Sequence, residues 1–122
     1  MFIVGLVIVA NVATSAPLKV SDDFVSNIQL GKSSTAYDMM SSDAQIATSS
    51  ADFAAMVENM SPILTGKPNN ISKEVSAETG SDPSAKVVYE ISGSDNYIHV
   101  ITVNLVQKNG DWKVLNFESV KK

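Results

Sequence analysis

Hydrophobic and polar residues follow two different periods along the chain, and the change between them divides the sequence into a helical part and a strand part. Up to about residue 62, apolar residues recur at the three- and four-residue intervals of an amphipathic helix. From about residue 71 onward, apolar and polar residues alternate, as in strands that bury one face. This order predicts an α+β fold in which helices come first and an antiparallel sheet follows.

Three helices are predicted before the sheet. The first follows Pro17, can continue the apolar stretch that precedes it, and ends at Gly31. A second, short helix is expected over 35–40, with the two serines before it as caps. The third begins at a Ser49 cap and ends before a proline, and its apolar stripe has helical spacing. That stripe consists of Phe53, Met56, Val57 and Met60. The polar stretch 41–50 is expected to be connecting chain.

Four strands are predicted in the second part of the chain. They cover 71–78, 86–92, 97–107 and 112–120, and clusters of turn-forming residues separate them. The strongest short hairpin signal is Asn109-Gly110, between the last two strands. We therefore expect three helices packed on one face of a curved, four-stranded antiparallel sheet.

The leader Met1–Ala16 is almost wholly apolar and has no polar stripe at helical spacing, which disfavours an ordinary core helix. A complete signal peptide is also disfavoured. No basic residue stands before the apolar run, and Pro17 would directly follow the cleavage point. As a helix it would reach about 24 Å, short of the ~30 Å hydrocarbon core of a bilayer. We expect residues 1–16 to be the truncated end of a transmembrane anchor whose basic cytoplasmic end is missing. Residues 17–122 would then form one domain outside the cytoplasm.

Composition excludes several classes of function. The hydrophobic content of 44% and charged content of 18% are typical of a folded domain. The net charge is −4, and all nine basic residues are scattered lysines, so no nucleic-acid-binding face is expected. There is no cysteine, which excludes disulfides, thiolate metal sites and thiol nucleophiles. The single histidine, His99, excludes a histidine-based zinc site, and no metal or other cofactor is expected.

Three segments carry a resemblance to a known family. They are the stretch 31–41 with its Ala36-Tyr37-Asp38-Met39-Met40 run, the stretch 53–62, and the closing hairpin 105–117 with Trp112 just past its turn. Their order and spacing resemble the cystatin-like α+β cone of the nuclear transport factor 2-like superfamily. The chain looks most like the small bacterial extracytoplasmic members behind a membrane anchor, many of unknown function. The likeness covers about residues 18–120 and implies the fold. The superfamily hosts isomerases, cyclases, dehydratases and binding modules, and none of its catalytic motifs matches this sequence residue by residue.

His99 is the residue most suited to acid–base chemistry. On its predicted strand it shares a face with Tyr97 and with apolar residues, near the end where the pocket of a cone would open. Such a role needs a partner that orients the ring, and the candidates for a partner near it in space are Glu90 and Asp95. The alternative is a histidine at a strand end that is exposed or satisfied by one hydrogen bond. The candidate pocket residues are Tyr37, Tyr97 and His99.

The acidic pair Asp22-Asp23 is better explained by the favourable dipole at a helix N-terminus than by catalysis. With no catalytic residues assigned, the leading hypothesis is a non-catalytic, membrane-anchored, extracytoplasmic domain that binds a protein partner or ligand. A second hypothesis is a small pocket enzyme of the isomerase or hydrolase type for a hydrophobic small molecule. It would use His99 as acid–base, with Tyr37 or Tyr97 as hydrogen-bond donor. A third is a dimerisation module, since sheets of this fold often pair face to face in relatives.

Overall fold

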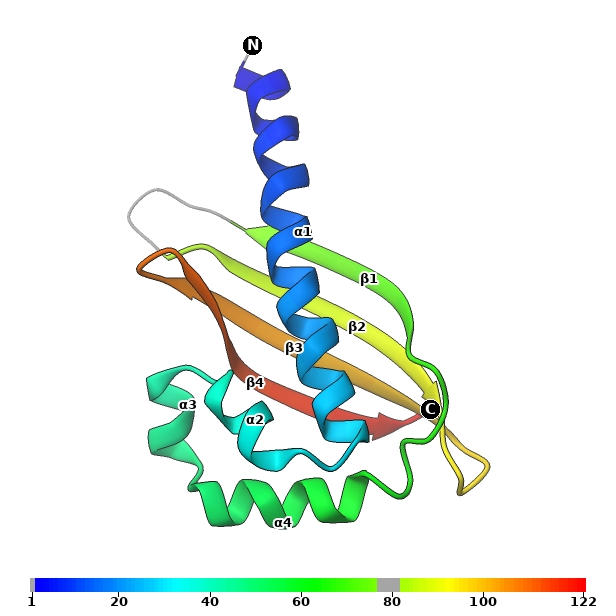
Figure 1. Ribbon diagram of the computed structural model, residues 1–122. Helices are drawn as coiled ribbons and strands as arrows, with labels where there is room; N and C mark the ends of the chain where they lie inside the picture. The colour runs from blue at the N-terminus through cyan, green and yellow to red at the C-terminus, as the bar shows by residue number, and fades with distance from the viewer. Residues whose placement is uncertain (1, 77–81) are drawn as a thin grey trace.

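The computed structural model describes residues 2–76 and 82–122, with side chains from residue 16 onward. In these residues four helices precede four strands (Figure 1): α1 (Phe2–Gln29), α2 (Ser33–Asp38), α3 (Ser42–Ala47), α4 (Ser50–Met60), β1 (Asn69–Ser76), β2 (Ser84–Ser92), β3 (Ile98–Lys108) and β4 (Asp111–Lys121). The strands form one antiparallel sheet in the order β1-β2-β3-β4. The predicted α+β class, with helices first and four antiparallel strands after them, is confirmed.

The hairpin between β3 and β4 forms where the sequence predicts it. Asn109 and Gly110 have positive φ angles of 51° and 85°, which the tight turn of a two-residue hairpin requires. Lys108 pairs with Asp111 across the turn. Alternate positions of the two central strands are buried on the side of the helices, namely Val87, Tyr89, Ile91, Ile101, Val103 and Leu105. The period of two in the sequence therefore marks the inner face of the sheet.

Helix α1 crosses the inner face of the sheet (Figure 1) and runs through Pro17 without ending there. The apolar residues at helical spacing after Pro17 face the core, because Phe24, Val25 and Ile28 are each at most 2% exposed and Val20 is half-buried. The explanation of Asp22 and Asp23 as acids at a helix N-terminus is wrong, since both lie well inside α1. Asp23 instead forms an ion pair of 3.3 Å with a lysine one turn earlier.

Helix α4 also forms as predicted. The Ser49 hydroxyl accepts a hydrogen bond of 3.2 Å from the backbone N–H of Asp52, which satisfies one of the free donors of the first turn. Phe53 and Val57 are buried. The ring of Phe53 lies 6.1 Å from that of Phe24 and 6.1 Å edge-on to that of Phe117, so α4 joins α1 and β4 in one aromatic core.

The prediction of three helices is wrong in one place, because α3 occupies the stretch 41–50 that was expected to connect. The Ser41 hydroxyl caps α3 by accepting a hydrogen bond of 3.1 Å from the N–H of Ala44. Ala44 is the buried residue of this short helix, while Ile46 is 84% exposed. Polar contacts and one small side chain hold the helix, and a search for an apolar stripe therefore misses it. The expected serine caps of α2 are also wrong, because Lys32 occupies its cap position and no side chain caps it.

The side chains of the predicted anchor, apart from its last residue, lie outside the described residues, as do the last two residues of the strand predicted at 71–78. In the part of the chain that the structure describes, no helix has the length and apolar character needed to cross a membrane.

Candidate functional site

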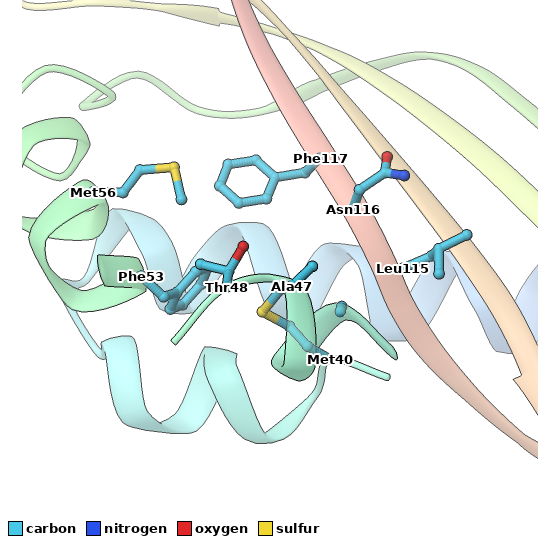
Figure 2. A pocket seen from close by; sticks show the side chains of 9 residues that line it. Met40, Ala47, Thr48, Phe53, Met56, Leu115, Asn116 and Phe117 are labelled. Carbon is cyan, nitrogen blue, oxygen red and sulfur yellow. The ribbon is translucent and has the colours of Figure 1, made fainter. Parts of the chain in front are cut away.

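A cavity of about 140 Å³ lies between the short helices and the edge strand β4. Figure 2 shows Met56 of α4 and Phe117 of β4 extending toward each other along one side of it. The other lining residues come from α3 and the segments on either side of it, from α4, and from the bulged part of β4: Met40, Ala44, Ala47, Thr48, Phe53, Leu115 and Asn116. Leu115 and Met56 are 38% and 37% exposed, so the cavity has an apolar rim that solvent reaches.

The cavity arises from a bulge in β4. The register passes from Asn104↔Asn116 to Leu105↔Val114, which leaves Leu115 without an opposite residue and bends the strand. One residue earlier, Val114 is tied to the helical layer: its N–H donates to the carbonyl of Met39 at 2.9 Å, and its carbonyl accepts from Ser41 at 2.8 Å. Because the strand is held at Val114 and bends at Leu115, space opens between it and α4.

The lining of this cavity suits an apolar ligand. Among the described lining residues, Thr48 and Asn116 are polar and none is charged, and the Asn116 side chain is already engaged by the Asn104 amide at 2.7 Å. A dry cavity of about 150 Å³ with an apolar lining is large enough to hold a benzene ring. The cavity of about 140 Å³ therefore has room for one aliphatic or aromatic side chain, or for a small molecule of that size. The hydroxyl of Thr48 is a polar group at its wall that can orient the bound group.

His99 lies at the far end of β3, in the turn region between β2 and β3. Its Nε2 is 3.0 Å from each carboxylate oxygen of Asp95, and its side chain is 7% exposed. The hydrogen bond from His99 is the main reason why the pKa of Asp95 lies below its ordinary value, and Lys121 at 3.8 Å adds to the effect. Asp95 is thus the partner of the ring, and Glu90 instead contacts Lys122 at 2.7 Å.

Gly93 closes the turn over this pair. A Cβ atom at Gly93 would lie 2.7 Å from Nε2 of His99 and would also collide with a carboxylate oxygen of Asp95. The absence of a side chain at this position therefore lets the turn pack directly on the imidazole. The His99–Asp95 pair is a buried contact that fixes the β2–β3 turn, and it leaves little of the ring accessible to a substrate.

The structure does not bring the three candidate pocket residues together. Tyr97 is 52% exposed beside the β2–β3 turn, with the Lys121 ammonium 4.5 Å above its ring. Tyr37 belongs to α2, and its hydroxyl is within hydrogen-bond distance of the carbonyls of Gln45 (3.0 Å) and Thr48 (2.8 Å). It thereby ties α2 to α3. Neither tyrosine, nor His99, lines the cavity beside β4.

Sequence reasoning missed the residues that do line this cavity. One signal was present: Val114-Leu115 interrupts the alternation of the last strand with two adjacent apolar residues, as a bulge does. Met56 belongs to the predicted apolar stripe of the third helix, yet its side chain reaches the surface at the rim.

Besides the His99–Asp95 pair, a polar contact around the buried Tyr89 joins α1 to the sheet. The Tyr89 hydroxyl donates to a carboxylate oxygen of Asp22 at 2.6 Å and lies 2.8 Å from the hydroxyl of Ser21, which is fully buried. Burial raises the pKa of Tyr89 well above its ordinary value, and the Asp22 carboxylate adds to the increase. This contact fixes the position of α1 over β2.

Within the described residues no cluster of three or more histidine, aspartate or glutamate side chains could hold a metal ion. No protein-family model matches the chain, and no curated protein matches it either.

Proposed function

We propose that this protein is a non-catalytic binding domain that holds an apolar group in the cavity beside β4. The observation that carries the proposal is the cavity itself, about 140 Å³ in volume, with an apolar lining and an apolar rim. Sites that bind small apolar groups have this character, namely a concave apolar lining with a few polar groups. The burial of the His99 ring supports a non-catalytic role over the pocket enzyme that would use it.

A titration with benzene tests the binding function. Methyl resonances of Met40 and Met56, which line the cavity, should shift and saturate in the full chain held in detergent micelles. Ala47→Leu places a larger side chain at the cavity wall and should abolish these shifts. The matched control is Ala55→Leu on α4, at an exposed position outside the cavity lining. Equal shifts in both variants would exclude this cavity as the binding site.

We further propose that residues 1–16 anchor the domain 17–122 to a membrane and place it outside the cytoplasm. The apolar character of the leader supports this placement. Detergent-free fractionation of cells that make the protein tests the anchor. The protein should sediment with the membranes, and recovery in the soluble cytosolic fraction would refute the anchor.

We also propose that the fold is the cystatin-like cone of the nuclear transport factor 2-like superfamily. Helices followed by four consecutive antiparallel strands support this assignment.

Dimerisation is a second candidate, and one observation favours it. The face of the sheet opposite to α1 carries exposed apolar side chains: Ile98 is 40% and Val120 is 58% exposed, and Val100 pairs with Val120 between the strands. Light scattering on the full chain in micelles tests it. If this face joins two copies, Val120→Lys should shift the mass toward that of one chain, whereas Ile46→Lys, at an 84% exposed position on α3, should not.

A further inference from the structure

Strand β4 has an open edge next to the cavity. In the sheet order its neighbour is β3, and no strand of the described chain lies on its other side. Lys122 donates to the carbonyl of Ile98 at 2.8 Å, and the register continues from there without interruption to Asn116↔Asn104. Because alternate residues of an antiparallel pair exchange hydrogen bonds, Phe117, Ser119 and Lys121 direct their N–H and C=O groups away from β3.

One residue of the chain before α3 already pairs with this edge of β4. Met40 forms a parallel bridge with Val114 through the two hydrogen bonds described above. Pairing stops after this residue because α3 begins at Ser42. The cavity lies where the pairing stops, since Met40 and Leu115 both line it. A visiting strand that continued along β4 would place side chains at the mouth of the cavity.

The helical segment 33–66 beside this edge is acidic, and the basic side chain of Lys113 lies at the other end of the edge, near Met40 and Ser41. Residues 33–66 contain no lysine and four exposed carboxylates: Asp38, Asp43, Asp52 and Glu58. The lysines at the end of β4 are already paired, Lys121 with Asp95 and Lys122 with Glu90. In the described part of the chain no ion pair involves Asp52, Glu58 or the exposed Glu118 of β4. This charge distribution favours a partner that carries basic residues.

We propose that the ligand of the cavity is an extended, lysine- or arginine-bearing peptide segment that adds a strand to β4. This proposal rests on the binding function proposed above. Main-chain hydrogen bonds to Phe117, Ser119 and Lys121 give affinity, and one apolar side chain inserted into the cavity gives specificity. The acidic helices attract the basic residues that flank the inserted side chain.

The test uses the full chain in micelles and a synthetic peptide with blocked termini, of the sequence lysine-threonine-valine-leucine-valine-threonine-lysine. Amide resonances of 115–121 and the Met56 methyl should shift and saturate together. Ser119→Pro removes one outward N–H without a loss of hydrogen bonds to β3, and it should weaken peptide binding about tenfold relative to Ser119→Ala. A peptide in which glutamate replaces both lysines should bind the wild-type protein more weakly than the lysine peptide does. The difference in affinity between the two peptides should shrink as salt is added.

Benzene binding separates this proposal from the binding function on which it rests. We expect Ser119→Pro to bind benzene as the wild type does while it loses the peptide. Equal peptide affinity in Ser119→Pro and Ser119→Ala would overturn strand addition and leave the cavity function intact. Peptide shifts confined to the opposite sheet face around Val120 would overturn it as well. A chain that binds neither benzene nor peptide would refute both proposals.

Discussion

Replacement of Tyr89 by phenylalanine removes one hydroxyl group and leaves the ring in place. In the wild type that hydroxyl donates to Asp22 at 2.6 Å and lies 2.8 Å from the buried hydroxyl of Ser21. Tyr89 itself is 2% exposed, so the ring of Tyr89→Phe has the same packing partners. The substitution therefore measures how strongly these hydrogen bonds hold α1 against β2, across a sequence separation of 67 residues.

The expected loss of stability follows from the environment of each partner. A hydrogen bond to a charged group contributes about 1.5–3 kcal/mol, and a buried hydroxyl that loses its partner costs about 1–3 kcal/mol. Water can replace the lost donor at Asp22, because this residue is exposed, whereas Ser21 is fully buried. We therefore expect a free energy of unfolding lower by about 2 kcal/mol, which corresponds to about 1 M in the urea midpoint for a domain of this size.

Fluorescence of Trp112, the single tryptophan of the chain and 8% exposed, reports urea unfolding. The matched control is Tyr97→Phe, since Tyr97 is 52% exposed, and its change should stay below about 0.5 kcal/mol. Equal midpoints for Tyr89→Phe and the wild type would refute the role given to this contact.

The pH dependence of stability gives an independent check. Because the pKa of Tyr89 is raised in the folded state, the unfolded state loses the phenolic proton first, and stability falls as the pH rises above about 10. Tyr89→Phe should lack that part of the fall.

Three further predictions concern the turn and the aromatic core. Gly93→Ala should lower the free energy of unfolding by about 1–3 kcal/mol, because its Cβ would lie 2.7 Å from Nε2 of His99; an unchanged urea midpoint would contradict this packing. Asp95→Asn should destabilise the protein at neutral pH but not at the most acidic pH. The pKa of Asp95 is lowered by folding, so its contribution is present above the unfolded-state value of about 3.9 and is lost as the pH falls through the folded-state value. Urea midpoints across the acidic range would test this, and a constant difference between variant and wild type would refute it. Phe53→Ala should cost about 3–5 kcal/mol in calorimetric or urea unfolding, and Met56→Ala clearly less, because Phe53 is fully buried and Met56 is 37% exposed. Equal losses would show that the aromatic cluster is not the centre of the core.

The elements that sequence reasoning predicts correctly are specified by local interactions. The turn at Asn109-Gly110 needs two residues that tolerate positive φ, and both are adjacent in the chain. The start of α4 depends on Ser49 and Asp52, three positions apart, and its burial follows the helical period of its own residues. The two central strands β2 and β3 are visible for the same reason, because their alternation is a property of each strand itself, whereas β1 buries no alternate face.

The features that escape prediction depend on residues distant in the chain. Helix α3 depends on the Ser41 cap and on Ala44, whose burial requires the neighbouring elements to be in place. The role of Asp22 depends on a tyrosine on β2. The cavity depends on how the bulge at Leu115 coincides with the hydrogen bonds of Val114 to the helical layer. The partner of His99 was among those considered, but its burial beneath Gly93 was not visible in the sequence.

The consecutive order of the strands has a consequence for how the chain folds. Each strand of the sheet pairs with the strand that follows it in sequence, so the sheet can form through successive short loop closures. The contact between α1 and Tyr89 instead requires a closure of 67 residues. We therefore expect the β3–β4 hairpin, with its two-residue turn, to form early, and α1 to dock on a sheet that is already assembled. The helix would then be the last element to join and the first to leave, so loss of its contact with Tyr89 should mainly raise the unfolding rate.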